Sequence, residues 1–485
     1  MNNSIHQFMT KGIENLGKVF DVYSHDLSKV AEMVSGVSDS VLKFGRSIIA
    51  EEWEFYDQLL YERKDLRPGW HVIRRDTVSK LTSLGEVSYQ KTYFYHPKTG
   101  ERCYLLDRLM EFQPKERLTE DAVARILDEA ADSSYRKGGL NASISGDFVS
   151  KETVMDKIHQ LKFPAVDVPE EKRKLTTLFI DADEDHVSLQ YLTDKGELKD
   201  SRRKTFMPKL VYVYEGIDME GDRHTLVHAK YFGGGYEGSN GVKQLWEEVY
   251  DYIGKAYDEE VLERIYVNGD GAEWIQSGAK AHGKAKFVLD KYHMHKYIIA
   301  ATSHLLDSAQ DARSEIWRAI NGKRKWQARA AFEKILAATE PESKRKAVET
   351  SMNYVLGHWP AIMNGVRNRK DNIHCSAEGH VSHIYSDRMS SRPLGWSVVG
   401  ADKMAKLRVY KKNGGDMLVL VRYQKEKLPE AVGSEEVIYS ARQMLIMEQA
   451  NRRRVEEKHA DVPTYTIPYR QIKKIAALKN NIWGL

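Results

Sequence analysis

The sequence predicts an α/β protein in which a sheet of mixed strands is combined with several helical regions. Three observations predict this fold class. From residue 171 onward, short apolar runs typical of buried strands alternate with helical patterns. Residues 1–65 and 295–371 carry apolar residues at helical spacings of three and four. Residues 66–113 are rich in β-branched and aromatic residues between turn signals.

Composition excludes several classes of protein. The chain has 485 residues, of which 41% are hydrophobic and 30% charged, enough for two to four domains with charged surfaces. Its two cysteines, Cys103 and Cys375, exclude a disulfide framework and suggest a reducing compartment. The N-terminus lacks the apolar run of a signal peptide, and no segment approaches the ~18 apolar residues of a membrane span. We therefore expect a cytoplasmic protein without membrane contact.

Seven regions follow one another along the chain. They are an N-terminal helical region (1–65), a small β-meander (66–113), a helix-turn-helix-like region (114–170), the first part of an α/β core (171–294), a basic all-helical insertion (295–371), the second part of the core (372–400) and a C-terminal region of short strands with one helix (401–485). In the core, three antiparallel strands are followed by strands that alternate with helices. This order is the one that an RNase H-like fold requires.

Residues 143–161 have the pattern of the second half of a helix-turn-helix. Gly146 would form the turn, and Ser150 could cap the helix that follows. Ser150 and Lys151 would then lie at the start of the helix that contacts DNA. Two packed helices without any DNA contact explain the same pattern nearly as well.

Acidic residues follow two buried strands of the predicted core. Asp181 directly ends one apolar run, and Asp270 ends the next. Ligands bind at the carboxyl ends of strands in α/β sheets, and carboxylates from neighbouring strands could bind Mg²⁺ there. Asp183 and Asp185 crowd the first strand end as well. The first ligand therefore stays open among these three, with Asp181 favoured because it ends the apolar run.

The third acidic candidate is Glu378, at the start of a helix expected from about residue 377 to residue 389. Apolar residues follow at three and four, so Glu378 would lie on a buried stripe, where a carboxylate is costly unless it is paired or metal-bound. Three carboxylates could hold two metal ions ~3.5–4 Å apart for phosphodiester cleavage. With 70 acidic residues in the chain, however, such positions also arise by chance, and an Asp after a strand is often a turn former.

Two smaller groups of residues allow alternatives. Asp290 and His293, three apart on one helix face, could contact a metal, a phosphate or the Asp270 loop, although a hydrogen-bonded histidine at a helix start is favoured for the pair alone. The cluster His374, Cys375, His380 and His383 suggests zinc, but one cysteine with grouped histidines is not a standard closed site.

Three residues downstream of this cluster are candidates for DNA contact. Arg388, Arg392 and Trp396 could contact the DNA backbone or stack on a base. Their alternative is a salt-bridged helix end and a core tryptophan.

Most of the chain resembles the ISLre-type bacterial insertion-sequence transposases, formerly an uncharacterised protein family, in the mutator-like group of DDE transposases. The segments that carry the resemblance are residues 178–183, 268–272, 378–383 and 392–396. The resemblance implies that Asp181, Asp270 and Glu378 bind two Mg²⁺ or Mn²⁺ ions and that Asp290 and His293 are accessory residues. The extra acids at the first site, Asp183, Glu184 and Asp185, depart from the family pattern.

The function implied by the resemblance is transposition. We expect cleavage of DNA at the element's terminal inverted repeats and strand transfer of the 3′-hydroxyl into target DNA, by a homodimer or larger assembly on DNA in the bacterial cytoplasm and nucleoid. Two alternatives remain: a catalytically inactive DNA-binding regulator derived from a transposase, and a zinc-stabilised DNA-binding module built on Cys375, His380 and His383.

Overall fold

The computed structural model describes residues 2–191, 204–220, 223–371, 373–392, 394–426 and 439–460. The chain divides into two compact units, Met1–Thr119 with Pro429–Leu485 and Glu120–Leu428, and each is described by itself. None of the helices in the described ranges combines the length and the apolar character needed to cross a bilayer.

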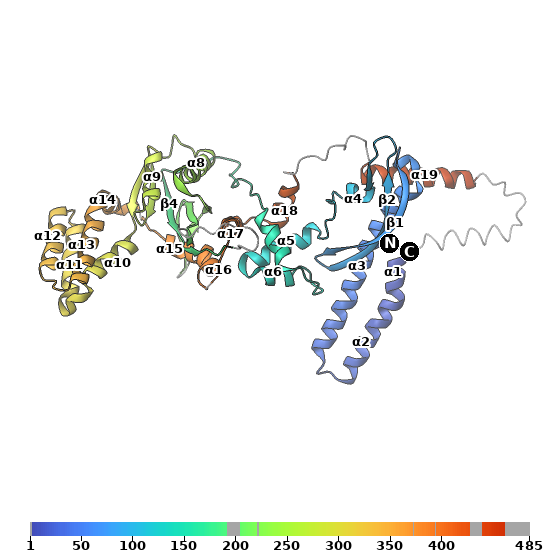
Figure 1. Ribbon diagram of the computed structural model, residues 1–485, viewed down its shortest axis with the longest axis horizontal. Helices are drawn as coiled ribbons and strands as arrows, with labels where there is room; N and C mark the ends of the chain where they lie inside the picture. Colours follow the sequence, from blue (N-terminus) through green and yellow to red (C-terminus); the bar gives the residue numbers. More distant parts are fainter. Residues whose placement is uncertain are drawn as a thin grey trace, which may run out of the picture. The chain divides into compact units, whose positions relative to one another are not determined.

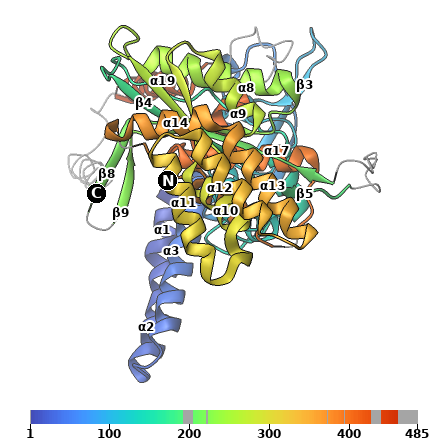
Figure 2. The ribbon, with the colours of Figure 1, turned by 90° about the vertical axis from the view of Figure 1, so that its left-hand side faces the viewer.

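The first unit begins with a helical hairpin, seen in two directions in Figures 1 and 2. Helix α1 (Asn2–Gln7), a π-helical turn (Phe8–Gly12) and α2 (Ile13–His25) lead into a short turn, and α3 (Val30–Glu62) returns antiparallel to them. The helical spacing of residues 1–65 predicts these elements.

The first unit continues with a three-stranded antiparallel sheet in the order β1 (His71–Thr82), β2 (Gly85–Tyr95), β3 (Arg102–Tyr104). The sequence predicts that the third strand extends to residue 106. It ends at Tyr104 because Leu105 starts helix α4 (Leu105–Leu109) and is fully buried in a core that also includes Met444 of α19 (Ala441–Ala460).

The second unit is built on a mixed five-stranded sheet in the order β10-β7-β4-β11-β12. Strands β4 (Thr177–Glu184), β7 (Lys209–Tyr214) and β10 (Lys230–Gly234) are antiparallel, while β11 (Arg264–Gly269) and β12 (Ala285–Leu289) run parallel to β4. Two small ribbons accompany the sheet: β5 (Val187–Ser188) with β6 (Thr205–Phe206), and β8 (Gly216–Glu220) with β9 (Arg223–Val227).

The two faces of β4 have different surroundings because successive side chains of a strand point to opposite faces. Leu178, Ile180 and Ala182 point into a hydrophobic core that α8 (Gly238–Ala256) and α9 (Glu273–Ala281) complete. The residues between them, Asp181 and Asp183 included, point to the other face. That face carries the polar chemistry described below.

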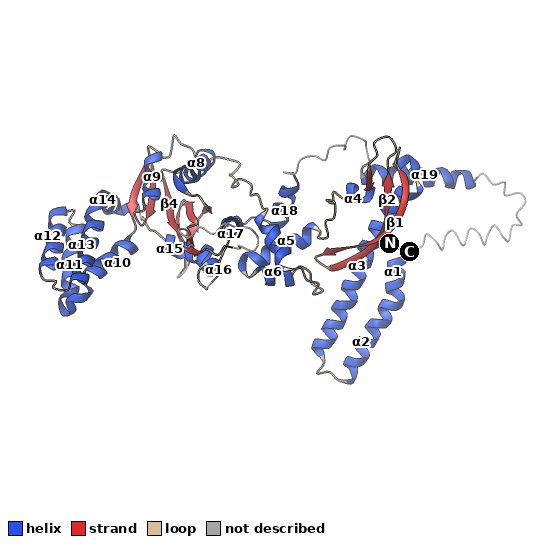
Figure 3. Cartoon of the chain, viewed as in Figure 1, coloured by secondary structure: helices blue, strands red, loops and turns tan. Residues whose placement is uncertain are grey.

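The insertion between the sheet and Glu378 is entirely helical, as Figure 3 shows. Its helices surround a hydrophobic core of their own; they are α10 (Lys291–Thr302), α11 (Ala309–Asn321), α12 (Lys325–Ala337), α13 (Glu342–Gly357) and α14 (Trp359–Arg367). A nearly continuous helix follows, made of α15 (Ala377–Val381), a π-helical turn (Ser382–Ser386) and α16 (Asp387–Met389).

Helices α5 (Glu120–Asp132), α6 (Tyr135–Leu140), α7 (Lys151–His159), α17 (Val398–Lys412) and α18 (Met417–Glu426) complete the second unit. The sequence predicts short strands for residues 401–485, but the described parts of that region are helices. The buried residues of α18 are Met417, Leu420 and Val421, a helical spacing within an apolar run that resembles a strand. The remainder of residues 401–485 lies outside the described residues.

Candidate active site

Asp181 lies in the middle of β4 and is completely buried. Its carboxylate accepts hydrogen bonds from five donors: Tyr212 Oη (2.7 Å), Tyr214 Oη (3.2 Å), Asn268 Nδ2 (2.7 Å), and the backbone N–H and the Oγ of Ser376 (2.8 and 3.4 Å). Tyr214 and Asn268 also donate to the carbonyl oxygen of His374. Burial raises the pKa of Asp181 to about 6 in spite of these donors. Asp181 therefore fastens three strands to the segment that precedes α15.

Asp183 lies two residues further along the same face and is 9% exposed. The pKa of its carboxyl is raised to about 7, first by burial and then by the negative charges of Asp270 and Glu378, while a backbone hydrogen bond from Glu184 and the charge of His293 act in the opposite direction. Electrostatic coupling of this kind requires proximity. The charges of Asp270 and Glu378 thus act on Asp183, whereas the carboxylate of Asp181 is surrounded by hydrogen-bond donors.

Sheet register explains why Asp183 meets Asp270. Strands β4 and β11 are parallel neighbours in which Asp181 is opposite Asn268. Two residues beyond that pair, Asp183 and Asp270 leave the same end of the sheet together. The Asp270 carboxylate accepts a hydrogen bond from the backbone N–H of Ala272 at 2.8 Å, which fixes the turn into α9.

Asp290 and His293 join this end of the sheet from β12 and α10. Asp290 caps α10 by accepting the backbone N–H groups of Tyr292 and His293 at 3.0 and 3.3 Å. The same carboxylate holds Nδ1 of His293 at 2.9 Å, and Nε2 of His293 lies 3.9 Å from Oε2 of Glu378. The hydrogen bond to Asp290 raises the pKa of His293, and the charges of Asp290, Asp183 and Asp270 add to that effect.

Glu378 is not buried, in contrast to the sequence prediction. Its side chain is 61% exposed in the first turn of α15, at the open end of the helix. The predicted stripe itself is buried; its members are Val381, Ile384, Tyr385, Arg388 and Met389. The helical spacing therefore predicts correctly which residues from Val381 onward are buried. It fails for Glu378, which lies in the first turn of α15 and faces His293.

We call Asp183, Asp270, Asp290 and Glu378, together with His293, the acidic group. Carboxylate oxygens with one imidazole suit hard divalent cations such as Mg²⁺ or Mn²⁺. Burial is the main cause of the raised pKa of Asp183, and the negative charges of Asp270 and Glu378, which a bound cation would neutralise, add to it. In the described ranges, no three His, Cys, Asp or Glu side chains are close enough to hold a metal as they stand. The ligand types of the acidic group fit a divalent cation. The exposed side chain of Glu378 would have to rotate toward the other carboxylates to bind the same ion.

The residues proposed for zinc do not converge on one point. Burial raises the pKa of Cys375 well above its usual value, which disfavours the thiolate that zinc requires. The ring of His380 packs against that of Tyr212 at a tilt of 36° with centroids 4.6 Å apart, and His383 is exposed beside Asp387. A zinc site therefore has no preformed ligand set in the part of the chain that the structure describes.

The candidate DNA contacts differ in their accessibility. Arg388 and Trp396 are buried, with the guanidinium 4.8 Å from the indole ring centroid, so neither presents a surface to DNA. Burial lowers the pKa of Arg388 to about 10. Arg392 and Lys151 are exposed, and Ser150 caps α7 through the backbone N–H of Thr153, as its position predicts.

A basic corner between α11 and α12 was only partly foreseen. The sequence marks residues 295–371 as basic, but the structure gathers exposed cations around an exposed tryptophan, Trp326, which is 69% exposed. The cations are Arg318, Lys323, Arg324, Lys325 and Arg329, and residues 318–332 contain no acidic residue. We call these five cations and Trp326 the basic corner. The exposure of Trp326 among these cations cannot be predicted from the spacing of residues in the sequence.

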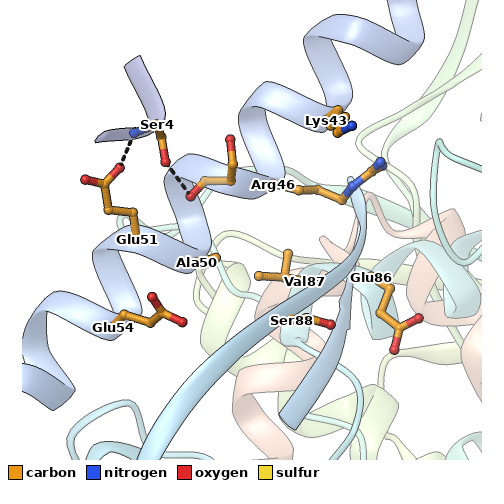
Figure 4. Close-up of a pocket in the computed structure, with 10 residues that line it drawn as sticks. Ser4, Lys43, Arg46, Ala50, Glu51, Glu54, Glu86, Val87 and Ser88 are labelled. Atoms are coloured by element: carbon orange, nitrogen blue, oxygen red, sulfur yellow. Dashed lines mark hydrogen bonds between the residues drawn. The ribbon is translucent and has the colours of Figure 1, made fainter. Parts of the chain in front are cut away.

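The first unit contains a pocket of about 660 Å³ between α3 and β2, shown in Figure 4. Cations and carboxylates both line it, and several already serve the fold. The backbone N–H of Ser4 donates to Glu51 at 2.9 Å, and Arg46 donates to the carbonyl of Leu84 at 3.0 Å. Glu54 accepts the backbone N–H of Gln90 at 2.7 Å. The pocket therefore defines no single ligand chemistry.

Comparison with known proteins decides the family. Residues 24–427 match the model of an uncharacterised protein family, UPF0236. The chain belongs to the UPF0236 family. A UPF0236 protein of Caldanaerobacter subterraneus subsp. tengcongensis is 35% identical over 405 residues, covering 82% of each chain. A UPF0236 protein of Streptococcus gallolyticus, named for the vanSb 3′ region, is 24% identical and covers 94% of this chain and 96% of its own. Another UPF0236 relative from Caldanaerobacter carries a name that joins eleven locus designations.

Proposed function

We propose that this UPF0236 protein is the DNA transposase of a bacterial insertion sequence, which cleaves the element ends and transfers the 3′-hydroxyl into target DNA. The observation that carries the proposal is the sheet register by which Asp183 and Asp270 leave the same end of the mixed sheet, where His293 lies 3.9 Å from Glu378. Three antiparallel strands followed by two parallel strands also support an RNase H-like core.

In this proposal Asp183 takes the place of Asp181 as the first metal ligand. A carboxylate with five donors around it, as Asp181 has, offers little remaining capacity for a cation, whereas the charges of Asp270 and Glu378 act on Asp183. Asp183, Asp270 and Glu378 would hold two Mg²⁺ or Mn²⁺ ions. Bound divalent ions would activate the attacking oxygen and stabilise the leaving oxygen of a phosphodiester.

The other residues of the acidic group position this centre. His293 is oriented by Asp290 and directs Nε2 toward Glu378, so it limits the orientations open to that exposed side chain. Asp181 holds the segment before α15 against the sheet. These contacts determine where Glu378 stands relative to the strand ends.

Two further observations support a DNA-binding protein that is encoded by a mobile genetic element. A single protein encoded at eleven loci, as the name of one relative indicates, is what an element that copies itself within a genome produces. The basic corner offers five exposed cations to a phosphate backbone and one exposed indole to a base. Exposed Lys151 and Arg392 remain candidates for further backbone contact.

The second candidate function is an inactive DNA-binding regulator. It is favoured by one observation: the carboxylates, where described, do not stand at coordinating distance from one another. This candidate keeps the basic corner and dispenses with cleavage.

A cleavage assay separates the two candidates. A supercoiled plasmid that carries the gene with its flanking DNA is incubated with the purified protein and Mg²⁺. We expect nicks at the element ends with wild type and Asp185→Asn, and none with Asp183→Asn or Asp270→Asn. DNA binding without cleavage by wild type would favour the regulator. Cleavage that survives Asp270→Asn would refute the proposed centre.

A further inference from the structure

The α2–α3 hairpin of the first unit exposes large apolar side chains. None of the residues of α2 is fully buried, and the buried residues of α3 lie only at its end, from Asp57 onward. Six large apolar side chains are between 48% and 60% exposed: Met9, Ile13, Phe20, Val30, Val34 and Val41. We call these six side chains the apolar face. The contact between α2 and α3 covers one side of each helix and leaves these side chains exposed.

Helical spacing puts the six side chains on the same side of the hairpin. Phe20 follows Val19, which packs against Gly36 of α3, so Phe20 is turned about 100° from the line of contact between the helices. On α3, the partly buried residues Met33, Gly36 and Ser40 mark the line of contact, and Val34 and Val41 are turned from it by roughly 105–125° in the same sense. Because the helices are antiparallel (Figure 1), turns in the same sense bring both stripes to one side.

Charged residues are confined to the remaining surface of the hairpin. The spacing turns Glu14, Lys18 and Asp21 of α2 more than about 90° away from the apolar stripe. The charges of α3, Glu32, Asp39 and Lys43, lie nearly opposite its stripe by the same count. Small residues, including Gly17, Ala31 and Ser38, border the stripes. The apolar face therefore carries no charged side chain that would need an oppositely charged partner.

We propose that the apolar face is the interface between two copies of this chain, whose hairpins pack together as a four-helix bundle. A surface without charge can meet its own copy across a two-fold axis without like-charge repulsion. The successive intervals of four and seven in 9-13-20 and in 30-34-41 are those of heptad positions, and Leu16 and Val37 stand seven residues after Met9 and Val30.

The size of the apolar face is sufficient for a specific dimer. Two helices, each about 10 Å wide, over about 20 Å of length give a footprint on the order of 400 Å² per copy. Two such footprints, enlarged because protruding side chains make the surface uneven, bury roughly 1,000 Å² in total. This area is at the lower limit of specific interfaces. The interface does not depend on the acidic group, so this inference stands or falls separately from the proposed function.

The test compares two equivalent Val→Asp variants of the full-length protein without DNA. Val34 lies on the apolar face and is 54% exposed, whereas Val22 lies on the other side of the hairpin and is 52% exposed. Sedimentation equilibrium should give a dimer for wild type and for Val22→Asp. We expect Val34→Asp to weaken dimerisation by at least tenfold, with unchanged helical content by circular dichroism. A monomeric wild type, or equal dimerisation of the two variants, would overturn the proposal.

Removal of residues 461–485 distinguishes a second copy from the chain's own C-terminal segment as the occupant. With a second copy, the shortened chain still dimerises, and Val34→Asp still prevents it. If the C-terminal segment covers the apolar face, wild type is monomeric and only the shortened chain associates, which contradicts the proposal.

Discussion

Asp181 and Asp183 lie two residues apart on one face of β4, yet their carboxylates meet opposite surroundings. Asp181 is enclosed by hydroxyl, amide and backbone donors, whereas Asp183 stands beside the charges of Asp270 and Glu378. The first residue can therefore serve the fold and the second the chemistry. Four predictions follow from this division and from the basic corner.

Substitution of the two aspartates should separate stability from metal response. Asp181→Asn replaces an acceptor oxygen with an amide donor facing other donors, so we expect a loss of about 1–3 kcal/mol in the free energy of unfolding. Asp183→Asn should not destabilise the metal-free protein. Thermal unfolding with and without Mg²⁺ checks this: at about 100 times the dissociation constant, Mg²⁺ should add about 3 kcal/mol to wild type and little to Asp183→Asn. Equal stabilisation of both would remove Asp183 from the ligand set.

The pH dependence of stability should carry the signature of Asp183. Its pKa is about 7 in the folded protein, against the ordinary 3.8, so the folded state holds a proton that the unfolded state has released. Stability from this group is therefore complete below about pH 4 and is lost as pH rises to about 7. Asp183→Asn should gain up to about 4 kcal/mol over metal-free wild type between these limits. Urea titrations of both proteins at pH 5 and pH 8 measure the difference, and a pH-independent difference would contradict it.

His293→Ala should reduce cleavage by about 10–100-fold without abolishing it, since the residue positions Glu378 and is not a principal ligand. His293→Gln, which can still donate toward Glu378, should recover part of the activity. The Mg²⁺ concentration for half-maximal cleavage should rise for the alanine variant. An unchanged Mg²⁺ requirement would indicate a structural role alone.

Neutralisation of the basic corner should weaken DNA binding in a salt-dependent way. Replacing Lys323, Arg324 and Lys325 with alanine removes three exposed cations, so the slope of log affinity against log salt should fall by up to about 3. Trp326→Ala should weaken binding to single strands more than to duplexes, because an unpaired base is free to stack. Fluorescence anisotropy with labelled oligonucleotides measures both effects. Lys243→Ala and Lys255→Ala on α8 are the control, and an equal loss with them would indicate unspecific electrostatics.

The sequence predicts the strands of the central sheet but not where β4 ends. Residues 178–180 are apolar, which suggests that this strand ends at Asp181. It continues to Glu184 because Ala182 still packs into the core on the opposite face. A buried aspartate within a strand is recognisable only when its donors are known, and Tyr212 and Asn268 belong to neighbouring strands.

The helical insertion and the cap of α10 were predictable because their signals are local. Asp290 and His293 are three residues apart, and the structure pairs them at 2.9 Å. The burial of Arg388 against Trp396 was not predictable, since it depends on how α16 meets the segment after it. The spacing of apolar residues along the sequence predicts which face of a helix is buried. Whether a residue at the end of a helix is exposed depends on contacts with segments distant in sequence, as Glu378 shows.

The contact between Asp181 and Ser376 joins segments 195 residues apart in sequence. A polypeptide still emerging from the ribosome has made Asp183 and Asp270 long before it has made Glu378. During synthesis, and in any product of premature termination before that point, the trio is incomplete and Asp181 lacks its backbone donor. If the chain cleaves DNA as proposed, this order of synthesis means that an unfinished chain lacks its third carboxylate and cannot cut the DNA of the cell that makes it.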